Sequence, residues 1–435
     1  MEESNCASPE TGWVPYHLSV SIQNNSEKVI LAYVPIYIKD HSQGEFIFDH
    51  SWADYAYSIG TSYYPKLLIG VPFTPVTGTR ILMNPKTVCQ TWCEYNDVYQ
   101  GTINKSKATK ESESTILELF RQIIGRYLTS IVQSNSLSSV HINFLTNEEA
   151  TSLAGNTISE AFINSSKEKR IMKLVEHPSI NATNFDFLRR TTIQYHWENK
   201  HPDYDDSPYE SFDEYLETFK SKKRINIKRE RRKILQEENI RIDAIEGRDI
   251  LKYPGLVEKM FDIYVSTVDK MYWGNQYLTL EFFVDLCNSD FVDHLCFICA
   301  RYRPDNEYYH EGEKDDDIHE LDVTDIFAGT FNIVQNGVFY GRYWGCLKEV
   351  KYLHFEVCYW SAIEYCIMKG LHRMEPGAGG GEHKWARGFD ATLVHSVHYI
   401  KDETLRNAVE EFLHYEKEED IETTEYLKAK RLGQI

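Results

Sequence analysis

The segment Ile326-Phe-Ala-Gly-Thr-Phe-Asn-Ile-Val-Gln-Asn-Gly-Val-Phe-Tyr-Gly-Arg-Tyr-Trp344 carries the clearest structural signal in the chain. Two strand-like runs, residues 326–334 and 338–344, flank Gln335-Asn-Gly337. An Asn-Gly pair between two strands favours a tight hairpin, because both turn positions need a positive φ. We therefore predict two antiparallel strands here.

The residues after this hairpin predict a helix, a short strand, a loop and a last strand. Tyr352 to Lys369 has apolar residues at helical spacing and is followed by Gly370, a residue that commonly ends helices. Leu371 to Glu375 is a short strand, and after a glycine-rich stretch Val394 to Ile400 is the last strand, before a helix from Asp402. Strands, helix, strand, loop and strand is the order of a GNAT-type acyltransferase core.

The length of 435 residues exceeds what one hydrophobic core usually holds, so we expect two domains. The first half also predicts strand, helix (Ser112 to Ser134) and strand (Val140 to Phe144). The composition changes at Asn199 to Pro208, which marks a boundary. We predict an α/β (α+β) fold of two tandem GNAT-like domains, 1–200 and 201–435, each a central mixed sheet flanked by helices. The acidic segment 304–325 is an expected loop insertion in the second domain.

Composition and charge exclude several classes of protein. No apolar run approaches the ~20 residues of a membrane span, and the acidic start Met1-Glu-Glu-Ser4 resembles no signal peptide, so we expect a cytoplasmic protein. The nine cysteines follow no disulfide framework, and the CxxC pair Cys296 and Cys299 lies in a strand-like run that points the two side chains to opposite faces, so we expect reduced thiols and no metal. The net charge of −19 opposes general adhesion to nucleic acid or anionic lipid.

The loop from Glu375 to Phe389 is the densest collection of functional residue types. Its glycines would let the backbone approach a ligand, and His383 has the ordinary pKa that suits proton transfer near neutrality. Lys384 and Arg387 could neutralise a phosphate or stabilise an oxyanion. The alternative is a mobile connection without a ligand. The candidate ligand-binding residues of this loop are Gly379, Gly380, Gly381, Glu382, Lys384 and Arg387, with His383 and Glu375 as catalytic candidates.

A second group of candidates lies around the start of the helix after the hairpin. In a GNAT-type fold the acyl donor sits where two central strands diverge, with its phosphates at the N-terminal end of the next helix. His354 is placed there to meet an anionic donor, and Glu356 to bind or deprotonate an amine, although the helix dipole alone would also explain a carboxylate in the first turn. Tyr340 and Arg342 alternate on the preceding strand and would share one face, where Tyr340 could protonate a leaving group.

The basic run Lys220 to Lys233 stands out in an acidic protein. It could contact RNA or a coenzyme phosphate. A solvated, salt-bridged helix face explains the same residues equally well.

The chain resembles the peptidoglycan biosynthesis/recognition family, the FemAB-like proteins built from tandem GNAT folds, over most of its length. The matching segments, besides the basic run, are Gly44-Glu-Phe-Ile-Phe-Asp49, Trp52-Ala-Asp54, Tyr63-Tyr-Pro-Lys66, Val71-Pro-Phe-Thr-Pro-Val-Thr-Gly78, Gln194-Tyr-His-Trp197, Tyr340-Gly-Arg-Tyr-Trp-Gly345, Leu353-His-Phe-Glu356, and Glu382-His-Lys384 with Arg387-Gly-Phe389.

This resemblance implies the fold and, more loosely, an activity. The better-known Fem relatives transfer an amino acid from aminoacyl-tRNA to an amine of a cell-wall precursor, and their Lys-x-Gly-Phe element is similar to Lys384 through Phe389. Three departures stand out. The chain starts within the family's first helix, so we expect an N-terminally incomplete first domain; the glycine run is longer; and the acidic loop is an insertion.

Together these observations predict an N-acyltransferase or aminoacyltransferase. An amine would directly attack an acyl group carried by acyl-CoA or aminoacyl-tRNA, with Glu356 or His383 accepting the proton, Glu375 orienting the loop, and no metal cofactor. The rival hypothesis is a non-catalytic module that uses the fold to bind an amine-bearing or aminoacylated partner. The rival expects Trp344, Trp360 or Trp385 to fill the gap between the diverging strands.

Overall fold

The computed structural model describes residues 1–24, 27–100, 110–155, 186–202, 207–268, 270, 276–303 and 321–431. These residues form two compact units, which we name by their place in the sequence. The central unit contains Met1–Cys6 and Gln194–Thr392, and the flanking unit contains Ala7–Ile193 and Leu393–Ile435. Most of the predicted acidic insertion, 304–320, lies outside the described residues.

This division corrects the predicted domains 1–200 and 201–435 at the C-terminal end. Residues 393–435 belong with the N-terminal half of the sequence, because β14 pairs with β7 and aligns His398 with His141. The helix α14 (Glu403–Arg431) buries Leu405, Val409 and Leu413 in a cluster with Trp52 and Ala56 of α1. The chain passes between the units three times, after Cys6, within β8 and within β14.

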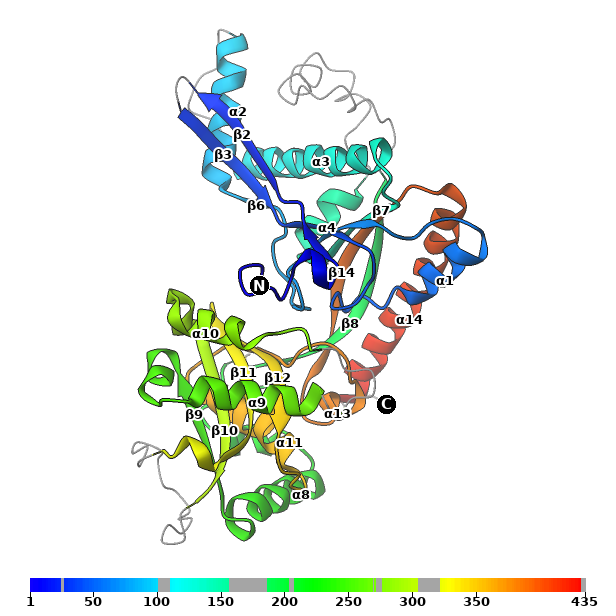
Figure 1. Ribbon diagram of the computed structural model, residues 1–435. Coiled ribbons are helices and arrows are strands. Elements are labelled where there is room, and N and C mark those ends of the chain that lie inside the picture. The colour runs from blue at the N-terminus through cyan, green and yellow to red at the C-terminus, as the bar shows by residue number, and fades with distance from the viewer. Residues whose placement is uncertain are drawn as a thin grey trace. The chain divides into compact units, whose positions relative to one another are not determined.

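The central unit has a mixed sheet with the strand order β9-β10-β11-β12-β13-β8 (Figure 1). All neighbouring strands are antiparallel except β12 and β13, which are parallel and are joined through α12. The strands are β8 (Leu188–Glu198), β9 (Ile240–Glu246), β10 (Leu295–Tyr302), β11 (Ile326–Gln335), β12 (Val338–Cys346) and β13 (Arg373–Glu375). The helices are α7 (Phe212–Glu217), α8 (Ser221–Arg232), α9 (Leu256–Val268), α10 (Leu280–Asn288), α11 (Leu353–Phe355), α12 (Ser361–Met368) and α13 (Glu382–Trp385).

Local sequence signals explain where several of these elements begin and end. The predicted hairpin is confirmed: Asn336 and Gly337 have φ values of 51° and 75°, and β11 and β12 are antiparallel. Thr279 caps α10 by accepting a hydrogen bond from the backbone N–H of Phe282. The predicted helix 352–369 is interrupted by a π-helical turn, Glu356–Trp360, between α11 and α12. Such turns often occur at functional sites.

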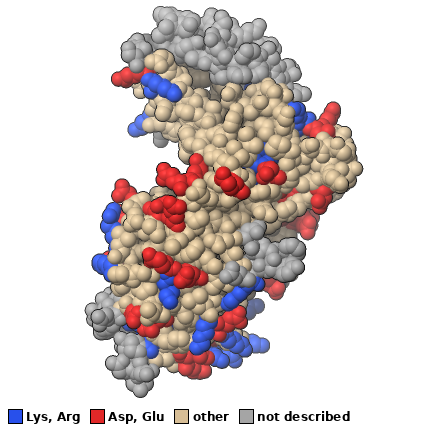
Figure 2. All heavy atoms as spheres, in the orientation of Figure 1, with Lys and Arg blue, Asp and Glu red and all other residues tan. Residues whose placement is uncertain are grey.

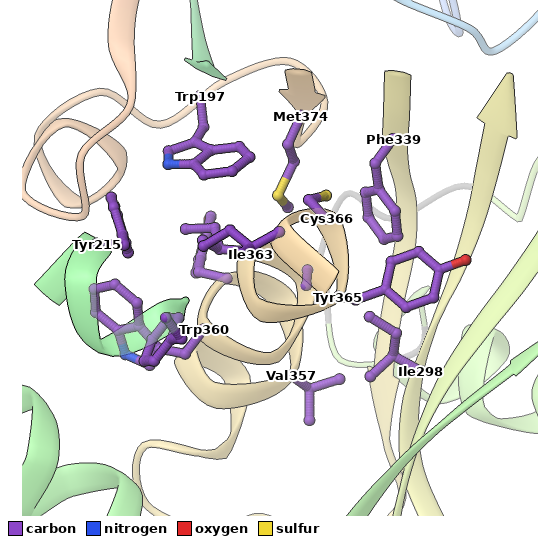
Figure 3. Close-up of a cluster of buried hydrophobic side chains, with 14 of the residues drawn as sticks. Trp197, Tyr215, Ile298, Phe339, Val357, Trp360, Ile363, Tyr365, Cys366 and Met374 are labelled. Carbon is purple, nitrogen blue, oxygen red and sulfur yellow. The ribbon is translucent and has the colours of Figure 1, made fainter. Parts of the chain in front are cut away.

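The hydrophobic core of the central unit surrounds α12. Figure 3 shows Trp197, Met374 and Trp360 packed around this helix, and all three are almost fully buried. Burial of large aromatic side chains is a major source of stability in a domain. The core therefore fixes the π-helical turn and the C-terminal end of β13, from which the glycine-rich loop starts.

The flanking unit has a second mixed sheet and a small antiparallel one. Its main order is β1-β4-β5-β7-β14-β8, with β5 and β7 parallel, and β2-β3-β6 form the small sheet. Its strands are β1 (Trp13–Pro15), β2 (Leu18–Asn24), β3 (Glu27–Val34), β4 (Ile36–Lys39), β5 (Lys66–Ile69), β6 (Leu82–Met83), β7 (Ser139–Leu145) and β14 (Asp390–Ile400). Besides α14, its helices are α1 (His50–Ser58), α2 (Pro85–Gln100), α3 (Lys110–Ser134) and α4 (Asn147–Ala154).

The predicted fold class is confirmed, because each unit has a mixed sheet, flanking helices and one parallel strand pair joined through helices. None of the helices in the described part of the chain is both long and apolar enough to cross a membrane.

The flanking unit fills the end of its own parallel strand pair. β5 and β7 pair through Ile69 and Ile142. Beyond them, the carbonyl of Phe144 accepts a hydrogen bond from the N–H of Gly78, and the carbonyl of Asn143 accepts one from Nε of Arg80 at 2.8 Å. Residues 78–80 are thus bonded to the backbone of β7 just beyond its pairing with β5.

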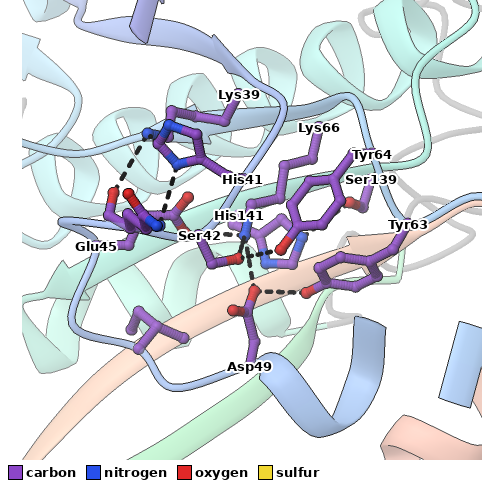
Figure 4. Close-up of polar contacts among 12 residues, drawn as sticks. Lys39, His41, Ser42, Glu45, Asp49, Tyr63, Tyr64, Lys66, Ser139 and His141 are labelled. Carbon is purple, nitrogen blue, oxygen red and sulfur yellow. Dashed lines mark hydrogen bonds and ion pairs between the residues drawn. The ribbon is translucent and has the colours of Figure 1, made fainter. Parts of the chain in front are cut away.

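Buried charges at the other end of β5 compensate one another (Figure 4). Lys66 Nζ lies 2.7 Å from Asp49 Oδ2, 2.9 Å from Glu45 Oε2 and 2.8 Å from Ser42 Oγ, and Tyr63 donates a hydrogen bond to Asp49. Burial raises the pKa of Glu45 to about 7, whereas for Asp49 the neighbouring Lys66 and His141 outweigh burial and hold its pKa below the usual value. Lys66 is therefore the counter-charge of two carboxylates that water does not reach.

Replacing Lys66 by Met should strongly destabilise the flanking unit, because it removes the buried cation that lies 2.7 Å from Asp49 and 2.9 Å from Glu45. We expect a loss of about 3–5 kcal/mol in the free energy of unfolding, measured by denaturant titration at pH 8. The matched control is Arg406→Met, which removes a half-exposed pair with Asp186 (3.5 Å) and should cost less than about 1 kcal/mol. Equal losses in both variants would show that the buried charges are not mutually compensated.

Candidate active site

The strands β12 and β13 pair over only three residues each. Val338, Phe339 and Tyr340 align with Arg373, Met374 and Glu375. Further along, β12 contains a bulge: Gly341 aligns with Asn332 and Tyr343 with Phe331, which leaves Arg342 as the extra residue. The bulge interrupts the alternation from which we expect Tyr340 and Arg342 to share a face, so that expectation stays a prediction. The Arg342 guanidinium lies 5.4 Å from the ring of Tyr343.

The glycine-rich loop that follows β13 is closed over His383. Gly377, Gly379 and Gly380 all have φ values between 65° and 85°, which side chains other than glycine rarely adopt. A Cβ atom on Gly380 would lie 2.2 Å from Cε1 of the His383 ring, and one on Gly381 would lie 3.0 Å from the hydroxyl of Tyr195. Glycine thus suits these positions because their φ values are positive. At Gly380 the absence of a side chain also leaves room for the imidazole of His383.

His383 is held by Tyr359 of the π-helical turn. Its Nε2 atom lies 3.1 Å from the Tyr359 hydroxyl, and the two rings meet edge to face. Burial and the nearby cations Lys384 and Arg387 lower the pKa of His383. The imidazole is therefore mainly neutral at pH 7 and can accept a proton.

Lys384 and Arg387 are buried cations held by carbonyl groups and aromatic rings. Lys384 is 4% exposed, and its Nζ donates to the carbonyl of Gly377 at 2.7 Å. Arg387 is 7% exposed, donates to the carbonyl of His383 at 2.7 Å, and lies 3.5 Å from the centroid of Phe355. No Asp or Glu of the described residues forms an ion pair with either cation.

The missing carboxylate has electrostatic consequences. Burial lowers the pKa of Lys384 to about 8. Burial also lowers the pKa of Arg387, and Tyr359 and then Glu230 oppose this shift. Nε of Arg387 makes no hydrogen bond to a described residue. A buried charge without a counter-charge is costly, so this position favours an anionic ligand.

Glu356 is engaged by residues of the same unit. Its side chain is buried, with Oε1 3.0 Å from Nε of Arg231 and 3.0 Å from the hydroxyl of Ser361. Arg231 also pairs with Glu364 at 2.6 Å. These contacts explain the carboxylate by structure, and its role as the base stays a prediction. Because Arg231 is engaged in these ion pairs, it is not one of the residues of Lys220 to Lys233 that could contact RNA.

His354 lies beside the same cluster but is not a cation. Its ring packs against Trp344 at 5.4 Å and Tyr359 at 5.7 Å. Burial, followed by His383 and Arg387, lowers its pKa to about 4, so its predicted role as a positive donor contact at neutral pH is not supported. Of the tryptophans that the rival hypothesis requires, Trp360 belongs to the hydrophobic core and Trp344 contacts His354.

The remaining predicted residues lie at the end of β13 and in the loop. Glu375 is buried, with Oε1 2.9 Å from Nη2 of Arg373, and Tyr340 is its cross-strand neighbour. Gly379 has open space around it, and Glu382 begins α13 and is exposed. Among the described residues, no group of three or more His, Cys, Asp or Glu side chains is arranged to hold a metal ion.

Two residues of this region were not predicted from the sequence. Tyr359 was read as part of the apolar stripe of a regular helix, and the π-helical turn that directs it to His383 has no simple sequence signal. His196, 3.9 Å from Glu375, lies on β8, more than a hundred residues away in sequence. Only the motif Gln194-Tyr-His-Trp197 indicated that β8 was of interest.

Gly380→Ala should displace His383, whereas Gly379→Ala should not. Both substitutions force alanine into a left-handed conformation, at about 1–2 kcal/mol each, but only the first adds a Cβ against the imidazole. We expect the pKa of His383, followed by NMR of its ring protons, to rise toward its ordinary value in Gly380→Ala and to stay lowered in Gly379→Ala. An identical titration in the two variants would mean that the loop does not position the ring.

Comparisons with known proteins place the chain in a family. A family model described as peptidoglycan biosynthesis/recognition, FemAB-like, matches residues 1–114 and 105–431. No curated protein matches the sequence. Similar solved structures include FemX (8% identity, 94% of this chain and 93% of that chain, TM-score 0.41), L-PGS from Bacillus licheniformis (7%, 69% and 77%, 0.38), and a tandem GNAT protein from the clavulanic acid biosynthesis pathway (6%, 89% and 83%, 0.33).

The family model extends over nearly the whole length of the chain, through both units and through the loop that carries His383, Lys384 and Arg387. The chain belongs to the FemAB-like family.

Proposed function

We propose that the central unit is an N-acyltransferase or aminoacyltransferase, and that the anionic part of its acyl donor binds at Lys384 and Arg387. The observation that carries this proposal is the pair of buried cations without a carboxylate partner among the described residues. Membership of a family described by peptidoglycan biosynthesis supports transfer to an amine of such a precursor.

In the proposed reaction the amine of the acceptor attacks the acyl carbon directly. The C–N bond forms as the bond to the donor oxygen or sulfur breaks, and the negative charge on the carbonyl oxygen is stabilised by Lys384 and Arg387. His383, neutral because of its lowered pKa, takes the proton from the attacking nitrogen and passes it to the leaving group. Tyr359 holds the imidazole in place for this transfer.

The donor is either acyl-CoA or aminoacyl-tRNA, and the helix α8 favours a contact with the longer polyanion. Lys223 of α8 is close enough to Arg387 for the two cations to influence each other electrostatically. Figure 2 shows Lys and Arg side chains over the region of α8, interspersed with acidic ones. Lys228 is engaged by Asp213, so Lys222, Arg224, Arg229 and Arg232 are the cations of α8 that we propose for RNA contact.

Donor affinity should fall as pH rises through about 8. In the free protein Lys384 is charged mainly below this pKa, and an anionic donor requires the charged form. Binding therefore involves no proton uptake or release below pH 7. Above pH 8 the protein must take up one proton on binding, which weakens the affinity. We expect up to a tenfold loss of affinity per pH unit above pH 8 for whichever of acetyl-CoA or aminoacyl-tRNA binds, measured by calorimetry. Lys384→Arg should abolish this pH dependence.

Lys384→Met should weaken donor binding by about 10- to 100-fold, from the ~1.5–3 kcal/mol of a charged hydrogen bond. The control is Lys228→Met, which removes an exposed lysine of the same unit and should leave acetyl-CoA binding unchanged. Wild-type affinity in Lys384→Met would rule out the proposed donor site. Normal binding without transfer to any amine would instead support the non-catalytic module.

A further inference from the structure

A row of three polar side chains crosses three neighbouring strands of the central unit. Tyr340 of β12 aligns with Glu375 of β13, and the antiparallel register that pairs Met374 with Trp197 brings Glu375 beside His196 of β8. Cross-strand neighbours point to the same face of a sheet. Met374 and Trp197 point into the core, so Tyr340, Glu375 and His196 lie on the opposite face.

Two of the three side chains in this row are buried, and Tyr340 and the neighbouring Arg373 and Glu198 are partly exposed. Glu375 is 3% exposed and His196 is 4% exposed. Arg373 and Glu198, which are cross-strand partners, and Tyr340 are each partly accessible. Nε2 of His196 is 3.3 Å from Oε1 of Gln194, and its Nδ1 has no hydrogen bond to a described residue.

This face carries carboxylates, whereas no Asp or Glu of the described residues pairs with Lys384 or Arg387. Glu375 lies 2.9 Å from Arg373, and Glu198 lies 3.7 Å from Lys200. Burial, then Arg373 and Lys384, lower the pKa of His196 to about 3, so the imidazole adds no positive charge at neutral pH. Burial raises the pKa of Glu375, which makes its carboxylate a better proton acceptor. The influence of Lys384 on His196 shows that the two sites are electrostatically close.

We propose that the row Tyr340, Glu375 and His196 is the acceptor subsite, which binds a primary ammonium group and takes its first proton. This inference rests on the proposed function, because it supplies the second substrate of the same site. A carboxylate beside a neutral imidazole and a phenol hydroxyl recognises an ammonium by charge and hydrogen bonds, and would bind an uncharged alcohol of the same shape more weakly.

The protons of the reaction then have separate destinations. An ammonium nitrogen must lose two protons to become an amide nitrogen. Glu375 takes the first, which converts the ammonium to the nucleophilic amine, and later releases it to solvent. His383 takes the second after attack and gives it to the leaving oxygen or sulfur, so one amide, one protonated leaving group and one free proton are formed.

The test uses the full-length protein and a matched pair of probes, Nα-acetyl-lysine amide and its neutral hydroxyl analogue, with binding followed by NMR at pH 7. We expect the wild type to bind the ammonium probe at least tenfold more tightly than the alcohol. Glu375→Gln should remove this preference, and Arg373→Gln, which removes the competing cation, should strengthen ammonium binding. Thermal unfolding of each variant checks that the fold is retained, and Glu375→Asp keeps the charge if Glu375→Gln does not fold.

The results distinguish this inference from the proposed function. Loss of the ammonium preference in Glu375→Gln, with unchanged affinity for acetyl-CoA or aminoacyl-tRNA, supports the acceptor subsite. An unchanged preference in Glu375→Gln, weaker ammonium binding in Arg373→Gln, or no ammonium binding to the wild type overturns it. If Lys384→Met leaves donor affinity unchanged while Glu375→Gln removes the ammonium preference, only the proposed donor site is refuted.

His196 has a positioning role that predicts a further result. His196→Asn keeps a hydrogen-bonding group but removes the imidazole next to Glu375. We expect the pH dependence of ammonium binding to shift while donor affinity stays constant, and His196→Gln to restore part of the effect. A change in melting temperature with no shift in this pH profile would show that His196 only packs the sheet.

Discussion

The central unit depends on two positive charges that it buries without an Asp or Glu partner among its described residues. Lys384 and Arg387 are retained by backbone carbonyls of Gly377 and His383 and by the face of Phe355. Carbonyl dipoles and aromatic quadrupoles offset only part of the cost of removing a cation from water. The glycine-rich loop, the π-helical turn and the aromatic core are the parts of the structure that keep both cations in place nonetheless.

In the flanking unit a buried cation has carboxylate partners. This unit has the same kind of parallel strand pair, but Lys66 is neutralised by Glu45 and Asp49, and Arg80 bonds to the carbonyl of Asn143. The charges of this cluster are balanced within the protein. A balanced cluster leaves little for a charged ligand to contribute, and this contrast is the physical reason for proposing the donor site in the central unit.

The local features of the fold were predictable from sequence, and the non-local ones were not. The Asn336-Gly337 hairpin follows from turn chemistry, and the loop from Glu375 to Phe389 was identified by composition alone. The ion pair of Glu356 was not predictable, because its partner Arg231 is 125 residues away along the chain. The bulge at Arg342 and the π-helical turn at Tyr359 each shift a side chain by one residue against a periodic pattern, so periodicity could not reveal them. The pairing of β14 with β7 is likewise invisible to local patterns.

That pairing affects how the protein is made. The flanking unit needs β14, whose residues emerge from the ribosome more than two hundred residues after β7. During most of synthesis, one edge of β7 has no strand beside it, and an unpaired buried edge invites association with other chains. The first part of the sequence to be translated is therefore among the last to complete its fold.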